Sequence, residues 1–220
     1  MQLSAFGEKF SARSGAVELM DDLGNALREN PNAILMGGGN PGKIPEMEAV
    51  FEQKLQALID DPQQQFDLLG KYQSPQGEPT FLQEISTFLK AQFKWPISER
   101  NIAISNGSQS AFFILYNMFA GTMSDGSQRT IHLPISPEYL GYADIGTSEN
   151  FFSATEPKIE LLDDNEFKYR VDFKELNINQ SAAALCVSRP TNPTGNVLTD
   201  NEIAHLDEIA IEKDIPLIID

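Results

Sequence analysis

The sequence predicts an α/β protein, a three-layer sandwich in which helices flank a mostly parallel sheet. Two observations predict this fold. From residue 101 onward, short apolar runs alternate with polar turns and helical patterns, as the strands and crossover helices of a parallel sheet do. The clearest repeat is an apolar strand over 182–187, a rigid polar turn over 188–196, a helix, and an apolar run over 215–219 before Asp220. Sheets of this kind bind ligands just beyond the carboxyl ends of their strands.

The first hundred residues are predicted to be mainly helical. Apolar residues recur at helical spacing over 16–29, 46–59 and 78–93, which indicates three amphipathic helices. The segment 60–77 is expected to be a loop. Between the first two helices, a run over 33–36 leads into three successive glycines at 37–39, where a ligand can approach the backbone closely.

The rest of the chain is predicted to contain most of the strands. Short apolar runs bounded by turns indicate strands over 101–105, 130–133, 149–154, 182–187 and 215–219. A helix is predicted over 109–119, and 156–180 is expected to be an acidic, irregular excursion. We expect residues 1–45 to contribute to a smaller N-terminal domain and residues 46–220 to belong to a larger domain that contains the sheet.

The charge and the cysteine content exclude several classes of partner and site. The formal net charge is −16, so no basic surplus exists to neutralise phosphates, and we expect no binding to nucleic acid or to anionic membranes. The longest apolar stretch, 111–119, is too short to span a bilayer. Cys186 is the one cysteine, which excludes disulfides within the chain and indicates a reducing cytoplasm. Its apolar surroundings favour a buried core residue over a reactive thiol.

Polar residues between the strand over 101–105 and the next helix could bind an anion. Gly107 permits close approach of a ligand, and the amides of Ser108 and Gln109 begin the helix. The free amides and the positive end of the helix dipole suit a phosphate. An ordinary helix cap by Asn106 or Ser108 would explain the same residues.

Three other residues after strands have the chemistry needed to hold a flat heterocycle. Tyr139 could stack on a ring, although it could equally be a core or rim aromatic. Asn192 lies in a turn stiffened by Pro190 and Pro193, which would fix an amide donor or form an Asx turn. Asp220 could pair with a cationic ring nitrogen or simply cap a following helix. Each residue alone is ambiguous, and their common placement after strands favours a binding site.

These motifs, in this order, resemble the aspartate-aminotransferase superfamily of fold-type I pyridoxal-phosphate enzymes. The turn over 188–199 reads SRPTNPTGNVLT and the glycine loop over 37–41 reads GGGNP, and together they are most similar to bacterial valine–pyruvate aminotransferases. The resemblance covers the whole chain and matches the first half of such an enzyme. It implies an incomplete large domain of fold-type I with part of the small domain, pyridoxal 5'-phosphate as cofactor, and a homodimer.

The resemblance assigns cofactor contacts to the residues that match the family's motifs. Residues 107–109 would form the phosphate loop. Tyr139 would stack on the pyridine ring, and Asn192 would hydrogen-bond the phenolic oxygen of the ring. Asp220 would pair with the protonated pyridine nitrogen and so keep the ring an electron sink.

Further matches concern the partner subunit and the substrate. Tyr72 matches the tyrosine that reaches the cofactor phosphate of the partner subunit. Gly38 and Gly39 match the loop that closes over the substrate carboxylate, and Asn192 would also contact the substrate. Arg189 lies beside the site and receives no catalytic role.

The sequence departs from the family's pattern after Asp220. In the family, the lysine that bonds to the cofactor follows the matching acid by a few dozen residues, and no lysine of 1–220 occupies that position. We therefore expect 1–220 to be the N-terminal part of a longer enzyme and to be inactive alone, with no catalytic residue and no metal site assigned in it. Turnover of valine with pyruvate by purified 1–220 would contradict this expectation.

The resemblance implies transamination between a small aliphatic amino acid, of the valine or alanine type, and a 2-oxo acid of the pyruvate type. Carbon–nitrogen and carbon–sulfur lyases of the same superfamily share every visible motif, and analysis of the products would separate them. A non-enzymatic effector-binding domain of the same fold is another alternative, although regulators of that kind carry a DNA-binding module ahead of it. A third is an independent α/β binding protein.

Overall fold

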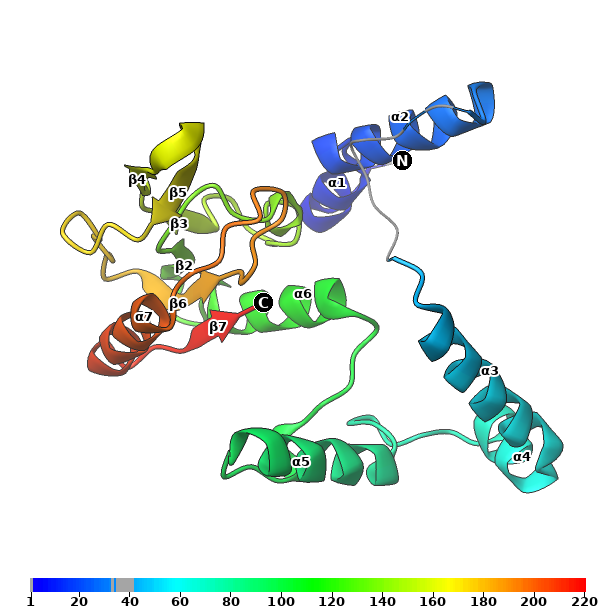
Figure 1. Ribbon diagram of the computed structural model, residues 1–220. Helices are drawn as coiled ribbons and strands as arrows, with labels where there is room; N and C mark the ends of the chain where they lie inside the picture. The colour runs from blue at the N-terminus through cyan, green and yellow to red at the C-terminus, as the bar shows by residue number, and fades with distance from the viewer. Residues whose placement is uncertain (1, 33, 35–41) are drawn as a thin grey trace. The chain divides into compact units, whose positions relative to one another are not determined.

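The computed structural model describes residues 2–32, 34 and 42–220 (Figure 1). The chain forms two compact units. One contains the residues up to Asp21 together with Asn106–Asp220, and the other contains Asp22–Ser105. We keep the domain boundary at residue 45 as a prediction.

A parallel sheet forms the centre of the first unit and confirms the predicted α/β class. Its parallel strands are, in spatial order, β3 (Phe152–Ala154), β2 (Gln128–Leu133), β6 (Ala182–Val187) and β7 (Leu217–Ile219). The short β1 (Gly121–Thr122) pairs antiparallel with β2. Strand β6 is buried along its whole length, as expected for a strand with helices on both faces.

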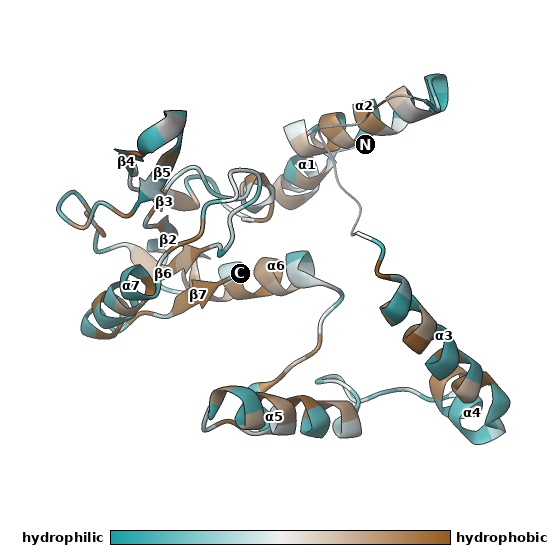
Figure 2. Ribbon diagram, in the orientation of Figure 1, coloured by the Kyte–Doolittle hydropathy of each residue, from teal (hydrophilic) through white to brown (hydrophobic). Residues whose placement is uncertain are grey.

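Helices α6 (Ser108–Phe119) and α7 (Asp200–Glu212) cover opposite faces of β6. Ala184 and Cys186 pack in one cluster with residues of α6. Leu185 and Val187 belong to clusters that contain residues of α7, among them Leu206. Successive side chains of a strand point to opposite faces, so the unit has three layers. In Figure 2, β7 is coloured as hydrophobic, whereas much of α7 is hydrophilic.

A hairpin and three short helices complete the first unit. Strands β4 (Lys158–Leu161) and β5 (Phe167–Arg170) pair antiparallel, with the 3-10 helix η3 (Asp163–Asn165) between them. The prediction that 156–180 is irregular is therefore wrong for this hairpin, whose alternating side chains pair across it. Helix η2 (Leu140–Tyr142) follows the segment after β2, and α1 (Ala5–Ser11) lies near the N-terminus.

The predicted helices of the first hundred residues are confirmed to within two residues at each end. They are α2 (Gly15–Glu29), α3 (Pro45–Asp60) and α5 (Pro79–Phe93). The loop predicted over 60–77 is wrong in part, because α4 (Pro62–Gly70) lies in it. The side chain of Asp61 caps α4 by accepting hydrogen bonds from the amides of Gln63 (2.9 Å) and Gln64 (3.2 Å).

The strand predicted over 101–105 is wrong. Asn101 ends a 3-10 helix, η1 (Glu99–Asn101), and the residues after it are extended without forming a strand. The amide of Ile104 donates to the carbonyl of Gln76 at 2.8 Å, and the Gln76 side chain donates to the carbonyl of Ile102 at 2.7 Å. The segment therefore bonds to the turn before α5, where Gly77 (φ +137°) leaves room for Ile104.

Membrane-spanning helices and metal-binding clusters are both missing from the described residues. Over those ranges no helix is long and apolar enough to cross a bilayer. The histidine, cysteine and carboxylate side chains of the same ranges form no group that could hold a metal ion.

Candidate active site

Five of the residues predicted from the strand ends line one cavity of the first unit. The cavity has a volume of about 200 Å3, and its lining consists of Ser108, Gln109, Tyr139, Ser188, Pro190, Asn192 and Asp220. These residues come from the start of α6, the segment after β2, and the segments after β6 and β7. The structure therefore brings together groups that lie far apart in the sequence.

The start of α6 forms one wall of this cavity. Gly107 is the N-cap residue of α6 and has φ +91°, a conformation that strains residues with a Cβ atom. A Cβ atom at this position would meet nothing within 4 Å, so there is open space on the side of Gly107 where a side chain would point. Because the N-cap is not Asn106 or Ser108, the simple capping interpretation does not apply. The amides of a first helical turn lack partners in the helix and favour anions.

Gly141 brings the side chains of Gln109 and Tyr139 close together. A Cβ atom on Gly141 would lie 2.5 Å from Nε2 of Gln109 and 2.5 Å from Cε1 of Tyr139. Both side chains therefore pack against the bare α-carbon. Any larger residue at 141 would push the amide, the aromatic ring or both out of place.

The turn that carries Asn192 is closed by its own hydrogen bonds. The amide of Thr191 donates to the carbonyl of Asn196 (2.9 Å), and the amide of Gly195 donates to the carbonyl of Thr191 (2.7 Å). The hydroxyl of Thr191 donates to the carbonyl of Ser188 (3.1 Å). The side-chain amide of Asn192 forms no hydrogen bond with any residue that the structure describes, so the predicted alternative of an Asx turn is not seen. The turn holds an exposed amide ready for a ligand.

Asp220 is held at both its backbone and its side chain. Its amide donates to the carbonyl of Val187 (3.0 Å), and its carbonyl accepts from the amide of Arg189 (3.1 Å), which continues the pairing of β6 with β7. The hydroxyl of Tyr142 donates to Oδ2 of Asp220 at 2.7 Å. Burial, and after it the contact with Asp220, raises the pKa of Tyr142 above its ordinary value. Tyr142 therefore keeps its proton and acts as a donor that orients the carboxylate.

Comparison with known proteins identifies the family. The family model described as aminotransferase class I and II matches residues 26–220. The chain belongs to this family. It is 47% identical to the valine–pyruvate aminotransferase of Escherichia coli (strain K12) over all 220 residues, which are 52% of that relative. The chain thus spans about half the length of the curated relatives it matches.

Solved structures support the same assignment of this class I and II aminotransferase chain. A structure from Psychrobacter arcticum 273-4 superposes with a TM-score of 0.91 at 42% identity, over 100% of this chain and 54% of that one. The valine–pyruvate aminotransferase of Salmonella typhimurium LT2 gives a TM-score of 0.79 at 43% identity, over 93% and 49% of the two chains. Aspartate aminotransferase of Thermus thermophilus, at 20% identity and a TM-score of 0.66 over 100% and 53%, shows the shared fold.

Not every predicted site residue of the aminotransferase chain lies at this cavity. Tyr72 belongs to the second unit, where its side chain is fully exposed. Gly38 and Gly39 lie outside the described residues. Arg189 pairs with Asp200 at 2.5 Å. Cys186 is fully buried and accepts a hydrogen bond from Tyr116 (2.9 Å), and burial raises its pKa to about 12. Its thiol is therefore a core group.

Four residues of the site were missed from the sequence. They support the lining side chains or complete the wall: Glu138, Gly141, Tyr142 and Ser188. The one available signal was the dense stretch over 137–142, in which a proline, a glutamate, two tyrosines and a glycine follow a strand.

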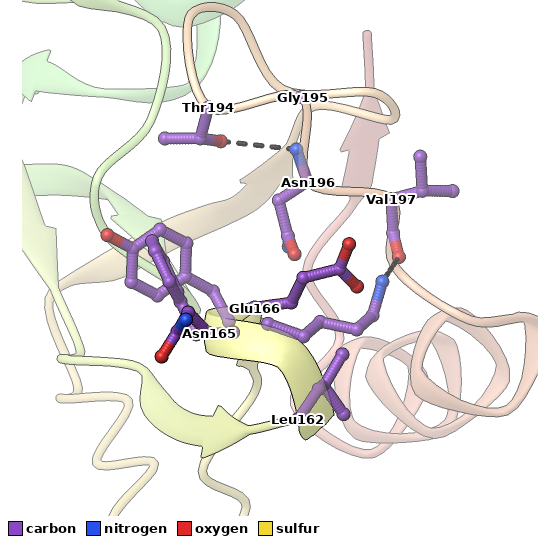
Figure 3. Close-up of a pocket in the computed structure, with 10 residues that line it drawn as sticks. Leu162, Asn165, Glu166, Thr194, Gly195, Asn196 and Val197 are labelled. Carbon is purple, nitrogen blue, oxygen red and sulfur yellow. Dashed lines mark hydrogen bonds between the residues drawn. The ribbon is translucent and has the colours of Figure 1, made fainter.

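A larger cavity lies beside residues 194–197 of the chain. It has a volume of about 500 Å3 and lies between the β4–β5 hairpin and residues 194–197 (Figure 3). The ammonium group of Lys168 donates to the carbonyl of Val197 (2.6 Å), and the amide of Asn196 donates to the hydroxyl of Thr194 (3.2 Å). None of the residues matched to the cofactor lines it. The smaller cavity is therefore the candidate active site.

Proposed function

We propose that the protein containing this chain is a pyridoxal-phosphate-dependent aminotransferase. It would transfer an amino group between a small aliphatic amino acid, of the valine or alanine type, and a 2-oxo acid such as pyruvate. Family membership and the 47% identity to a valine–pyruvate aminotransferase support this proposal. The observation that carries it is the single cavity that gathers Ser108, Gln109, Tyr139, Asn192 and Asp220.

The chemistry of the lining fits pyridoxal phosphate, the cofactor of class I and II aminotransferases. The open start of α6 at Gly107 suits the phosphate group. Tyr139 offers an aromatic face for a ring, Asn192 an amide donor for a ring oxygen, and Asp220 a carboxylate for a protonated ring nitrogen. The phosphate, the ring face, the ring oxygen and the ring nitrogen of the cofactor therefore each have a complementary group at the cavity.

When bound, the cofactor supplies an electron-withdrawing ring that stabilises negative charge on the α-carbon of the substrate. In our proposal, Asp220 keeps the ring nitrogen protonated, and Tyr142 holds that carboxylate in place with its 2.7 Å hydrogen bond. Tyr139 would cover one face of the ring, and Asn192 would fix the rotation of the ring in its plane. We assign no residue of 1–220 to the covalent or proton-transfer steps.

The remaining proposals concern assembly and the substrate. Tyr72 would reach the cofactor phosphate of a partner subunit in a homodimer, and Gly38 and Gly39 would close over the substrate carboxylate. Exposed apolar side chains on α3 and α4, among them Phe51 and Leu69, form faces suited to burial against another surface, and we propose a second copy of the protein as that surface. We further propose a cytoplasmic location, and domains divided near residue 45.

Incubation of the full-length protein with pyridoxal phosphate, valine and pyruvate tests the proposed function. We expect equal amounts of alanine and the 2-oxo acid of valine, measured by chromatography. Asp220→Asn is expected to lower kcat by about 10²–10³-fold, the typical loss when one aligned electrostatic contact is removed. Release of ammonia in place of a second amino acid would instead indicate a lyase. Binding of the amino acid without any turnover would indicate an effector-binding domain.

A further inference from the structure

Glu138 connects two walls of the cavity. Its Oε1 accepts a hydrogen bond from the amide of Ser188 (2.9 Å), at the end of β6. Its Oε2 accepts from the amide of Tyr139 (3.2 Å), the residue proposed to cover the ring. One partly buried carboxylate therefore fastens the turn that carries Tyr139 to the strand that leads toward Asn192.

A chain of hydrogen bonds continues from Ser188 to Asp220. The hydroxyl oxygens of Ser188 and Tyr142 lie 2.8 Å apart, and the hydroxyl of Tyr142 lies 2.7 Å from Oδ2 of Asp220. A carboxylate only accepts, so Tyr142 donates its one proton to Asp220. The hydroxyl of Ser188 must then donate to the oxygen of Tyr142. The order of donors is fixed from Ser188 to Asp220.

Packing holds this chain of hydrogen bonds in one arrangement. Tyr142 and Ser188 are each only 3% exposed. The ring of Tyr142 contacts Phe112, Tyr116 and Tyr139, with ring centroids 5.1, 5.5 and 5.4 Å away. Water has little access to the two hydroxyls, and the surrounding rings prevent the Tyr142 side chain from turning aside. A shift at Ser188 is therefore passed to Asp220.

We propose that Glu138 is a positioning residue, which acts through Ser188 and Tyr142 to hold Asp220, and directly to hold Tyr139, against a pyridine-ring cofactor. This inference rests on the proposed function. A carboxylate is suited to the task because it offers two acceptors to two amides. A glutamine offers one acceptor and would place its NH2 group against the other amide. Burial, opposed by the bonds from Ser188 and Tyr139, raises the pKa of Glu138.

Cofactor binding to the full-length apo protein tests the proposal. The variants are Glu138→Gln, Tyr142→Phe, the double variant, and the matched control Glu149→Gln, which neutralises an exposed carboxylate of the same unit. We measure the Kd for pyridoxal phosphate by absorbance titration, the pH midpoint of the absorbance of the bound cofactor, and the melting temperature of the apo protein. Ser188→Ala keeps the amide that donates to Glu138 and removes the hydroxyl that bonds to Tyr142, so it tests the link between Glu138 and Tyr142 if Glu138→Gln melts at a lower temperature.

Glu138→Gln and Tyr142→Phe are each expected to raise the Kd about tenfold, which corresponds to about 1.4 kcal/mol. The double variant is expected to raise the Kd by more than either single variant but well below the product of the two effects, because Glu138 shares the path through Tyr142 and has a separate contact with Tyr139. Both single variants are expected to move the absorbance midpoint to lower pH, while Glu149→Gln leaves the Kd and the midpoint unchanged.

A Glu138→Gln variant that behaves like Glu149→Gln would overturn the positioning role and leave the proposed function intact. So would a double variant with a roughly hundredfold loss, the product of two independent effects. If the unaltered apo protein binds no pyridoxal phosphate, the proposed function fails, and the positioning role fails with it.

Discussion

The sheet-bearing unit and the helical unit bury their apolar residues to very different degrees. In the first unit, Ile131, Leu185 and Leu206 are completely buried. In the second unit, α3 and α4 bury none of their residues, and α5 buries only Leu82 and Ser86. Similar apolar patterns in the sequence thus have opposite outcomes in the structure.

This difference teaches what an amphipathic pattern can and cannot predict. The pattern identifies the face of a helix that is suited to burial, but it does not identify the surface that covers this face. In the sheet unit, α6 and α7 find that surface on β6. The candidate active site lies in the sheet-bearing unit, where the described residues bury a core of their own. The apolar faces of α3 and α4 are consistent with the proposed homodimer.

The largest expected contrast comes from one leucine in each unit. Leu206→Ala is expected to lower the free energy of unfolding by about 3 kcal/mol, because it leaves a cavity in a packed core. Leu55→Ala removes a side chain that is 61% exposed and is expected to cost below about 0.5 kcal/mol at low protein concentration. Urea denaturation, with hydrogen exchange to locate the loss, measures both effects.

Protein concentration sharpens this contrast. The cost of Leu206→Ala should not depend on concentration, whereas the cost of Leu55→Ala should grow as a homodimer forms, since association stabilises the folded state by mass action. If Leu55→Ala costs as much as Leu206→Ala at every concentration, the apolar face of α3 is covered within a single chain. The contrast between the units would then be wrong.

The fold could be predicted where the residues of one strand or helix are enough to specify that element. The continuous apolar run over 182–187 became β6 with the predicted bounds, because a short apolar run between turns is typical of a fully buried strand. The run over 101–105 also has residues typical of a strand. A strand forms only where a neighbouring strand pairs with it, and here the amide of Ile104 donates to the carbonyl of Gln76 instead. Helix α4 was missed although Asp61 and Pro62 are a typical cap and first residue.

The residues that line the site could be predicted from the sequence, whereas the residues that hold them in place could not. Tyr139, Asn192 and Asp220 follow strands, and this rule needs no knowledge of packing. Glu138 and Tyr142 act through partners 50 and 78 residues away, and no local pattern specifies such contacts. Gly141 has a role only because two side chains meet above it.

A smaller contrast is expected on acidification, because both histidines of the chain lie in the sheet unit. His132 is buried, and its ring nitrogens lie 2.9 Å from the hydroxyl of Ser153 and 3.2 Å from that of Thr155. Burial, and after it Lys213, lowers the pKa of His132 from 6.5 to about 4. Between pH 6.5 and pH 4, His132 therefore binds a proton in the unfolded chain but not in the folded chain. The free energy of unfolding consequently falls as the pH falls toward 4.

We expect His132 to account for a loss of about 2 kcal/mol between pH 7 and pH 5. Urea denaturation of the protein and of His132→Gln at both pH values isolates this contribution, because the variant keeps every carboxylate that titrates. A pH dependence that is the same in both proteins would show that His132 is protonated equally in the folded and unfolded states.

The smallest expected contrast concerns the first turns of two helices. In the sheet unit, the hydroxyl of Thr199 accepts from the amide of Glu202 (3.2 Å), and the carboxylate of Glu202 accepts from the amide of Thr199 (2.8 Å). In the helical unit, Ile44 precedes α3 and provides no side-chain cap.

Thr199→Ala is expected to destabilise the start of α7 by about 1 kcal/mol, and Ile44→Asp to stabilise the start of α3 by up to about 1 kcal/mol. Hydrogen exchange at the amides that follow each cap measures the two effects. Unchanged exchange after Thr199→Ala would mean that Glu202, which also accepts from the amide of Val171, holds this end of α7 through the sheet unit's core. The better-covered unit would then owe its stable helix ends to tertiary contacts as well, and α3 would respond to its new cap more strongly than α7 to the loss of its own.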